Sequence, residues 1–436
     1  MNSRTIIRQG ASVCPVCKKR IPAHEEEDRS SGKVWQVKVC PTCGEVRTII
    51  WNGYMPIESW RGDYPEMLSG DAEGCPDNCG LCSNHLRDTC CILYEVTNRC
   101  NFNCRFCFAR GGESPAPDKS LERIRKDIED MVIPGKSLVQ LSGGEPTVRD
   151  DLPEIVRYAK SCGAKYVQLN TNGRRLAADQ DYLRRLKEAG LSFVFLQFDG
   201  TDDKIYDALR GESLFAEKCR IIEACAGEQL GVTLVMTVVP GVNDDNIGDT
   251  LRFAVSNSPK VRGLHLQPVS YFGRVPHEPA EADRYTLDML IRDVVGQSEG
   301  LISVDNLKPS ACDHPLCGFH GDFVVMPGDR LLALSKGASA NKGFNKDQAA
   351  ADKNREFVGR RWQREPDPEP NSCEISMPSS GAMDMMSFLK RIKSHGFTVT
   401  SMAFQDAWNL SLERLRSCSL HVYDDGKIVP FCSYYL

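Results

Sequence analysis

Residues 91–107 read CILYEVTNRCNFNCRFC, and this stretch decides the fold. Its first half, Ile92 to Val96, is a short apolar run of the kind that forms a strand buried on both faces. Cys100, Cys104 and Cys107 follow directly with the spacing CxxxCxxC. Three thiolates in one loop can hold three irons of a [4Fe–4S] cluster and leave the fourth iron open. The alternative is a structural site completed by a distant cysteine, because structural sites are normally closed.

Strands and helices alternate after this point. Short apolar runs predict six strands, at Ile92–Val96, Leu138–Leu141, Tyr166–Asn170, Phe193–Phe198, Thr233–Val239 and Leu264–Val269. Helical patterns between them predict helices at Leu121–Val132, Leu152–Ser161, Gln180–Ala189, Phe215–Ala226 and Asn246–Val255. Such alternation is typical of a parallel sheet or barrel. We therefore expect an α/β fold, an open and partial (β/α)6 barrel, with its chemistry at the carboxyl ends of the strands.

Two of these strand ends are polar. The second predicted strand runs into SGGEP (residues 142–146), where Gly143 and Gly144 allow the backbone to approach a ligand and Glu145 can accept from an ammonium group. The third runs into NTNG (residues 170–173), where Asn170 and Asn172 can hydrogen-bond a ribose. Both stretches are also ordinary turn signals, so neither decides the function alone.

The composition narrows the class of protein. The chain has 436 residues, 20 cysteines and a net charge of −5, with 41% hydrophobic and 26% charged residues. These values are ordinary for a globular protein, and the acidic balance opposes nucleic-acid binding as the main activity. No apolar run approaches the ~20 residues of a membrane helix, and the polar start is unlike a signal peptide. We expect a cytoplasmic protein, in which this many cysteines indicate metal binding rather than disulfides.

The N-terminal cysteines form two CxxC knuckles. Cys14 and Cys17 stand in CPVC, and Cys40 and Cys43 stand in CPTC. An acidic stretch between them, Glu25 to Asp28, is expected to be a solvated loop tip. Four thiolates in two knuckles suit zinc and iron equally, so the spacing predicts a mononuclear metal site without choosing the metal.

The cysteine loop and the polar strand ends together resemble the radical S-adenosylmethionine (SAM) superfamily over about residues 91–269. The resemblance implies that Cys100, Cys104 and Cys107 bind a [4Fe–4S] cluster whose open iron is chelated by SAM. It also implies that Phe106 lies near the adenine, that Gly143, Gly144 and Glu145 hold the methionyl amine, and that Asn170 and Asn172 are ribose contacts. In that superfamily SAM cleavage releases a 5′-deoxyadenosyl radical, which takes hydrogen from an unactivated C–H bond.

A narrower resemblance lies outside this core. CPDNCGLCSNH (residues 75–85) with Thr89-Cys90 and the paired knuckles resembles the archaeal tetraether lipid synthase family and its bacterial relatives, some of which have been labelled pterin methyltransferases. That family implies a rubredoxin-like mononuclear site and two auxiliary [4Fe–4S] clusters. The first auxiliary set is Cys75, Cys79, Cys82 and Cys90, and the second is Cys312, Cys317, Cys418 and Cys432. Cys373 competes with Cys418 for the last place, and Cys91 is an extra thiol beside the first set.

The domain organisation follows from these assignments. We expect a rubredoxin-like or zinc-ribbon-like module over residues 1–62, an auxiliary-cluster connector over 63–90, the radical SAM partial barrel over 91–275 and a Cys-rich substrate and cluster region over 276–436. Residues 335–372 are polar and indicate a linker, 383–417 indicate helix, and 420–436 indicate a hairpin. Cys162, Cys219, Cys225 and His265 are expected in the core. Arg274 is expected either to face substrate or the SAM carboxylate or to be an ordinary surface arginine, and His314 is expected to be either a ligand or a loop hydrogen-bonder.

The favoured function is radical coupling of lipid alkyl chains. It predicts a hydrophobic tunnel from the cluster to the surface, walled by residues 270–334 and 383–417, with Met383, Met385 and Met386 as channel candidates and a possible peripheral membrane contact. The alternative is a radical methyltransferase or other C–H functionalising enzyme for a pterin or similar small molecule, which predicts a compact pocket with a few convergent polar groups. Either enzyme needs a low-potential electron donor such as ferredoxin or flavodoxin. A tRNA-modifying enzyme and a non-enzymatic iron–sulfur protein fit the residues less well.

Overall fold

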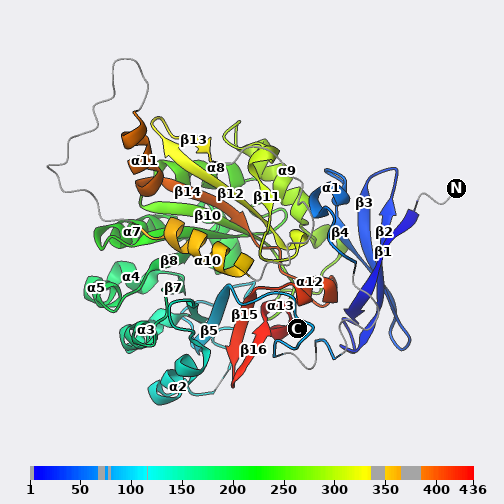
Figure 1. Ribbon diagram of the computed structural model, residues 1–436, viewed down its shortest axis with the longest axis horizontal. Coiled ribbons are helices and arrows are strands. Elements are labelled where there is room, and N and C mark those ends of the chain that lie inside the picture. Colours follow the sequence, from blue (N-terminus) through cyan, green and yellow to red (C-terminus); the bar gives the residue numbers. More distant parts are fainter. Residues whose placement is uncertain (1–3, 67–73, 77–79, 115, 335–348, 365–383) are drawn as a thin grey trace.

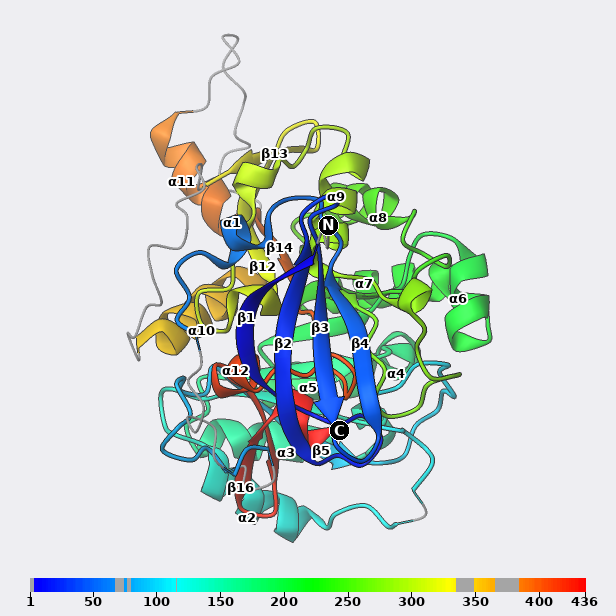
Figure 2. The ribbon, with the colours of Figure 1, turned by 90° about the vertical axis from the view of Figure 1, so that its right-hand side faces the viewer.

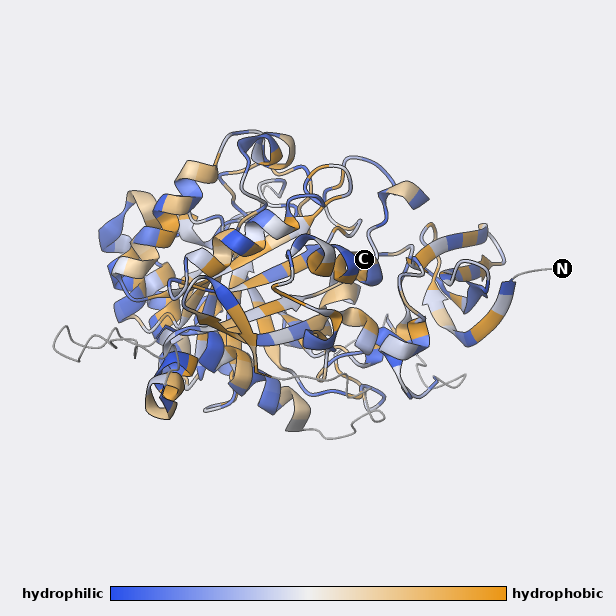
Figure 3. Ribbon diagram, turned by 90° about the horizontal axis from the view of Figure 1, so that it is seen from above, coloured by the Kyte–Doolittle hydropathy of each residue, from blue (hydrophilic) through white to orange (hydrophobic). Residues whose placement is uncertain are grey.

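The computed structural model describes residues 4–66, 74–76, 80–114, 116–334, 349–364 and 384–436. Figure 1 shows a small four-stranded sheet on one side of the molecule and a much larger α/β body beside it. Hydropathy follows this architecture, because the strands of the larger body are mostly apolar and the outer faces of its helices are polar (Figure 3). None of the helices in these ranges is both long and apolar enough to cross a membrane.

The N-terminal sheet is an antiparallel meander of four strands in sequence order (Figure 2). Its strands are β1 (Arg4–Val13), β2 (Arg20–Asp28), β3 (Lys33–Cys40) and β4 (Gly44–Trp51). The two knuckles are the tight turns between β1 and β2 and between β3 and β4, at the same end of the sheet. The expected loop tip at Glu25 to Asp28 is wrong, because these residues pair with β1 and β3 inside β2. Glu25 is instead ion-paired with the buried guanidinium of Arg61.

The six predicted strands are present and lie side by side, in chain order and parallel. They are β5 (Cys91–Thr97), β6 (Leu138–Gly143), β7 (Tyr166–Thr171), β8 (Phe193–Gln197), β9 (Gly231–Val238) and β10 (Val261–Pro268). The connecting helices are α2 (Leu121–Met131), α3 (Leu152–Ser161), α4 (Arg174–Ala178), α5 (Gln180–Glu188), α6 (Asp203–Arg210), α7 (Phe215–Gly227) and α8 (Ile247–Ser256). This alternation confirms the α/β fold, and it brings the carboxyl ends of all six strands to one edge of the sheet.

The sheet is larger than six strands because the C-terminal third of the chain extends it at both edges. It has twelve strands, and its path runs from β11 through β12, β14 and the six central strands to β15 and β16. The added strands are β11 (Lys308–Pro309), β12 (Phe319–Met326), β13 (Arg330–Ala333), β14 (Gly396–Ser401), β15 (Leu420–Asp424) and β16 (Lys427–Pro430). The predicted hairpin is confirmed in β15 and β16. The helical prediction for 383–417 is only partly right, because the β-branched run in β14 pairs parallel with β10.

Further helices lie outside the strand–helix alternation. They are α1 (Ile57–Arg61), α9 (Leu287–Gln297), α10 (Ala349–Trp362), α11 (Met385–Ser394), α12 (Leu412–Arg416) and α13 (Phe431–Tyr434). Single 3-10 turns lie at η1 (Pro146–Val148), η2 (Glu281–Asp283), η3 (Val304–Asn306) and η4 (Pro315–Cys317).

Helix α10 corrects the prediction of a linker over residues 335–372. Its Val358 and Trp362 are buried against the sheet, and Trp362 donates its indole N–H to Thr398 Oγ1 at 2.9 Å. Arg355 of the same helix donates to the carbonyl oxygens of Thr89 and Cys90. The segment looked like a linker because its flanks are polar, but these three side chains dock the helix across the sheet. The rest of the predicted linker, apart from residues 363 and 364, lies outside the described residues.

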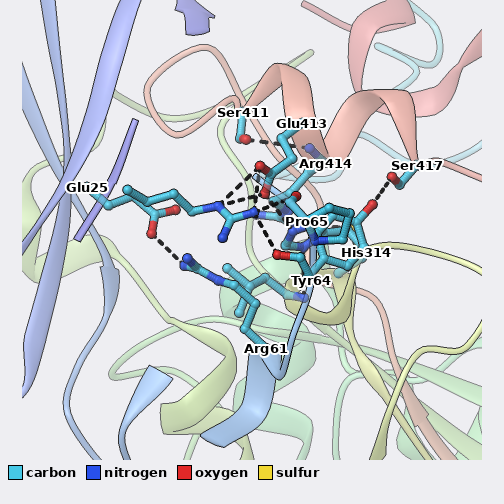
Figure 4. Close-up of polar contacts among 12 residues, drawn as sticks. Glu25, Arg61, Tyr64, Pro65, His314, Ser411, Glu413, Arg414 and Ser417 are labelled. Atoms are coloured by element: carbon cyan, nitrogen blue, oxygen red, sulfur yellow. Dashed lines mark hydrogen bonds and ion pairs between the residues drawn. The ribbon is translucent and has the colours of Figure 1, made fainter. Parts of the chain in front are cut away.

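The N-terminal sheet is held against the larger body by buried polar contacts (Figure 4). Arg8 donates to both carboxylate oxygens of Glu413 at 2.8–3.1 Å and to the carbonyl of Pro65 at 2.7 Å. Glu413 is also hydrogen-bonded to His314 at 3.1 Å. Lys38, which is fully buried, donates to the carbonyl of Ala407 at 2.8 Å. These groups all find partners, whereas Gln36 Oε1 and the Nε atoms of Arg61 and Arg414 are buried without a hydrogen-bond partner among the described residues.

Candidate active site

The cysteine loop lies at the carboxyl end of β5, as the sequence predicted. Cys100, Cys104 and Cys107 are half-buried and all three line one cavity. The loop is braced by Arg274, whose backbone exchanges two hydrogen bonds with Cys107 and whose guanidinium donates to the carbonyl of Gly111 at 2.9 Å. Arg274 also forms an ion pair with Glu113. Arg274 was predicted to be either a substrate or SAM contact or a surface arginine, and the structure shows it instead as a support for the cysteine loop.

The glycines of SGGEP are required by the approach of another backbone segment. A Cβ atom on Gly143 would lie 2.2 Å from the carbonyl oxygen of Thr97, and one on Gly144 would lie 2.2 Å from that of Arg99. Gly144 and Glu145 donate their backbone N–H groups to these same carbonyls at 2.8 Å. The turn after β6 is thus fastened to the residues that lead into Cys100, and only glycine permits this distance.

Glu145 is a buried junction between strand ends. Its Oε1 accepts from the Thr147 hydroxyl at 2.7 Å and the Thr171 hydroxyl at 2.6 Å, and its Oε2 accepts from the backbone of Asn172 at 2.7 Å. The side chain is 2% exposed and lines the cavity. Since Oε2 has one such partner among the described residues, it retains the capacity to accept from a ligand ammonium.

The two predicted ribose contacts differ. Asn172 donates its amide to Asn101 at 2.7 Å and accepts from the backbone of Arg174, so its side chain ties the cysteine loop to β7. Asn170 accepts from the Gln168 amide at 2.9 Å through its Oδ1 and lines the cavity. Phe106, the predicted adenine neighbour, also lines the cavity and stands edge-on to Tyr271 with ring centroids 6.0 Å apart.

A charged group that the sequence analysis left out of the site lies after β8. Asp199 is fully buried and forms a bidentate ion pair with Arg210 at 2.7 Å. Arg210 lines the cavity, and the Asp199 and Cys104 side chains raise the pKa of its guanidinium against the effect of burial. Lys218 stands behind this pair and donates to the carbonyl of Asn172 at 2.7 Å. The position of Asp199 at the end of a buried strand could have indicated this ion pair, because charged residues are rarely buried without a partner.

The cavity has a volume of about 330 Å³. It extends from the cysteine loop along the face of β5 to β10 and ends at helix α10. Its lining includes seven amide side chains: Gln140, Gln168, Asn170, Asn172, Gln197, Gln267 and Asn354. The predicted tunnel walls contribute little, since from residues 270–334 and 383–417 the lining contains only Ser270, Phe272, Cys312, Asp313, Met402 and Phe404. Among the described residues the cavity is open to the surface, and no tunnel walled by the two predicted segments is seen.

Other channel candidates are elsewhere. Met385 and Met386 are 69% and 65% exposed on α11 and do not line the cavity, and Met383 lies outside the described residues. His265, expected in the core, is buried with Nδ1 at 2.8 Å from the Thr400 hydroxyl, but it also lines the cavity. Cys225 is buried, and Cys162 and Cys219 are partly buried on their helices.

The residues present fit a site-differentiated cluster with SAM. Three thiols converge on the cavity from one loop and form no disulfide, which suits three irons of a [4Fe–4S] cluster. Next to them are Glu145, which can accept from an amino group, and Arg210, which can donate to a carboxylate. Glu145 and Arg210 are therefore complementary to the ammonium and the carboxylate of an amino acid moiety.

The knuckle cysteines form a tight group of four thiols. The Sγ atoms of Cys14, Cys17, Cys40 and Cys43 all lie within 4.8 Å of one another. Cys17 and Cys40 are 3.8 Å apart, which is the edge of a tetrahedron with metal–sulfur bonds of about 2.3 Å. Burial opposes ionisation of Cys14, but hydrogen bonds from Cys17 and Val16 outweigh it and lower the pKa of this thiol to about 7. The geometry therefore suits one mononuclear ion.

The predicted ligands of the two auxiliary clusters do not form two separate groups, because cysteines of the first set contact cysteines of the second. Cys90 of the first set is hydrogen-bonded to Cys312 of the second, and both line the cavity. Burial raises the pKa of the Cys418 thiol, and nearby Cys432 and Cys317 raise it further. Cys75 packs in the same apolar cluster as Cys432, whereas Cys82 is exposed. Cys79 and the competing Cys373 lie outside the described residues. His314 is bonded to Glu413 rather than to a thiol.

Comparison with known proteins agrees with this site. Residues 94–254 match the Radical SAM superfamily, and residues 6–52 match a family described as the HMPTM N-terminal zinc ribbon domain. The 7,8-dihydro-6-hydroxymethylpterin dimethyltransferase of Methanocaldococcus jannaschii is 33% identical over 97% of this chain and 92% of its own length. Two further relatives match less than half of the chain. They are the Fe-coproporphyrin III synthase of Methanosarcina barkeri, 33% identical over 42% of this chain and 45% of its own length, and a probable GTP 3′,8-cyclase of Pyrococcus abyssi, 35% identical over 37% and 52%.

Proposed function

The chain belongs to the radical SAM superfamily and, within it, to the family of the archaeal pterin dimethyltransferase, and from this premise we propose that it is a radical SAM methyltransferase acting on a pterin or a closely similar heterocycle. The resemblance to tetraether lipid synthases gains no support from these relatives, and the alternative prediction of a small-molecule enzyme fits them better.

The observation that carries the proposal is the shape and lining of the cavity. A lipid-coupling enzyme needs a long apolar channel, whereas a volume of about 330 Å³ is the size of a small-ligand site. The amide side chains along β6, β7, β8 and β10 offer donors and acceptors without charge. Aromatic rings at Phe195 and Trp362 close the far end. This combination suits a flat, neutral heterocycle with polar edges.

The chain's own residues divide the work at the site. When bound, the cluster and SAM supply a 5′-deoxyadenosyl radical that removes hydrogen from an unactivated C–H bond. We assign Cys100, Cys104 and Cys107 to the cluster. Glu145 and Arg210 hold the charged ends of the methionyl group, while Asp199 keeps Arg210 oriented. Phe106 and Asn170 are assigned to the adenosyl part of SAM.

The remaining assignments are part of the same proposal. The ribbon holds one zinc or iron ion, and the cysteines of residues 75–90 and 312–432 hold two auxiliary clusters. Cys90 and Cys312 line the cavity, which supports the proposal that one of these clusters lies at its wall. A low-potential reductant such as ferredoxin or flavodoxin supplies the electrons. We propose that the four predicted segments, with boundaries at residues 62, 90 and 275, have separate functions. Strands from the last segment, 276–436, nevertheless join the central sheet.

The test is an anaerobic reaction of the reconstituted protein with SAM, dithionite and 6-hydroxymethyl-7,8-dihydropterin. We expect a product heavier by one or two methyl groups and 5′-deoxyadenosine released in proportion to it. Isoprenoid diether lipid serves as the competing substrate. Coupled lipid chains with unmethylated pterin would overturn the proposal.

A further inference from the structure

We propose that the deep half of the cavity is a specificity subsite for the lactam edge of the substrate ring, read by Gln140 and Gln168. This inference rests on the proposed pterin activity and adds the two residues that select the ring. The subsite is built from β6, β7, β8, β10 and α10, beyond the cysteine loop.

The two glutamines are adjacent on the same face of the sheet. Gln140 of β6 and Gln168 of β7 are register partners in a parallel pair, and both line the cavity. Neighbouring strands lie about 4.8 Å apart, so two such side chains can reach neighbouring atoms of one ring.

Each glutamine is oriented by a fixed neighbour, and the orientations differ. The carbonyl oxygen of Gln140 accepts from the Cys91 thiol at 3.2 Å, which leaves its N–H₂ group as the end without a partner in the described part of the chain. The N–H₂ group of Gln168 donates to Asn170 at 2.9 Å, which leaves its carbonyl oxygen. The result is a donor next to an acceptor. A lactam presents C=O next to N–H, and it is complementary to this pair.

The surroundings exclude charge and favour a flat ring. Phe195 stands against Trp362 with ring centroids 4.8 Å apart and against His265 at 5.2 Å. Burial lowers the pKa of His265 to about 4, so this imidazole is neutral at physiological pH. Of the charged residues that line the cavity, Glu145 and Arg210 lie beyond the carboxyl ends of β6 and β8, and the carboxylate of Asp313 accepts hydrogen bonds from Ser419 and Ser310. A neutral heteroaromatic ring therefore fits the deep half, and the zwitterionic part of SAM fits the charged half.

The role of Cys91 also becomes clear. Cys91 does not belong to either predicted set of cluster ligands, and its thiol donates a hydrogen bond to Gln140. A thiol at this position selects which end of the Gln140 amide faces the cavity. This makes Cys91 a positioning residue for the subsite.

The experiment pairs side-chain variants with ring analogues in the reconstituted holoenzyme. Dissociation constants are measured by pterin fluorescence for 6-hydroxymethylpterin, its N3-methyl derivative, which lacks the lactam N–H, and the corresponding 2,4-diaminopteridine, which lacks the lactam C=O. The wild type should bind both analogues about tenfold or more weakly than the parent compound, because each leaves a buried polar group unpaired. Gln168→Met should lose its discrimination against the N3-methyl compound alone, and Gln140→Met its discrimination against the diamino compound alone.

Gln180→Met, an exposed glutamine on α5, is the matched control and should keep wild-type discrimination and wild-type SAM cleavage. Two variants on two strands keep the test informative if one of them fails to fold, as judged by iron content and melting temperature. Wild-type protein that discriminates while both glutamine variants discriminate equally well would overturn the subsite and leave the proposed function standing. Wild-type protein that neither binds nor methylates any pterin would overturn both.

Discussion

The cysteine knuckles of the N-terminal ribbon and the cysteine loop after β5 use the same ligand chemistry in opposite ways. The four knuckle thiols lie within 4.8 Å of one another, and two of them are buried. The three loop thiols are all half-buried and face a cavity that also contains Glu145 and Arg210. A closed set of four leaves no coordination position free, whereas an open set of three does. The number of thiol ligands and their access to a cavity therefore distinguish a structural metal site from a reactive one.

The largest expected effect comes from removing one thiol at each site. Cys104→Ala should abolish 5′-deoxyadenosine formation, because the loop then has only two ligands left. Cys14→Ala should lower the melting temperature by several degrees, since a structural metal site contributes to folding directly, but should retain SAM cleavage. High-performance chromatography of 5′-deoxyadenosine and thermal denaturation measure the two outcomes. Cleavage activity in Cys104→Ala, or its complete loss in well-folded Cys14→Ala, would contradict the distinction.

A pair of glycines gives the next contrast. Gly144→Ala places a Cβ 2.2 Å from the carbonyl oxygen of Arg99, one residue before Cys100. We expect a cost of about 3 kcal/mol or more and loss of iron from the loop, because two backbones would have to separate. Gly44→Ala in the ribbon turn meets no atom within 4 Å, and its φ of +88° costs only about 1–2 kcal/mol. Iron analysis and urea denaturation compare the two variants. Equal iron content would show that the glycine turn does not hold the loop.

The sequence predicted the parts of the site that depend on short spacing. The cysteine loop, the glycine turn and the six central strands follow from residues that are close in the chain, and the structure has all of them. Their local patterns are strong because a parallel strand buried on both faces has few alternatives. The knuckle cysteines also needed only their own turns to be brought together.

The sequence did not predict contacts between distant segments. Arg210 reaches the cavity because of its buried pair with Asp199, and nothing local distinguishes it from a surface arginine. Helix α10 closes the far end of the cavity although its flanks are polar, because its docking depends on Trp362 meeting Thr398. The lipid prediction gains no support for a similar reason. Apolar segments after residue 270 looked like tunnel walls, but β11, β12 and β14 use them to widen the sheet.

A third prediction concerns the charge behind the open site. Lys218 is 1% exposed, and its burial lowers its pKa to about 8 from the model-compound value of 10.5, although Asp199 opposes the shift. The unfolded chain then binds more protons than the folded one between these values, so stability should rise from about pH 8 to pH 10.5. The gain attributable to Lys218 is at most about 3 kcal/mol.

Lys218→Met isolates this contribution from other titrating groups. As the pH rises through this window, the urea midpoint of the wild type should increase relative to that of Lys218→Met. Lys260, which is partly exposed and paired with Glu223, provides the control through Lys260→Met. A constant difference between wild type and Lys218→Met from pH 7.5 to 10.5 would show that the ammonium is not destabilised by burial.

The smallest effect is expected at the junction between the two regions. Arg8 of β1 meets Glu413 of α12, and both side chains are only 11–12% exposed (Figure 4). Arg8→Met leaves Glu413 its second partner, His314, so breaking the pair costs less than isolating a buried charge. A double-mutant cycle of Arg8→Met and Glu413→Gln should give a coupling energy of about 1–2 kcal/mol. The exposed pair Arg184 and Asp181, replaced by Met and Asn, should give about 0.5 kcal/mol or less.

If the ribbon is a structural module, SAM cleavage by Arg8→Met should remain near the wild-type rate while the urea midpoint falls. A loss of cleavage in proportion to the coupling energy would instead tie the closed metal site to the chemistry of the open one.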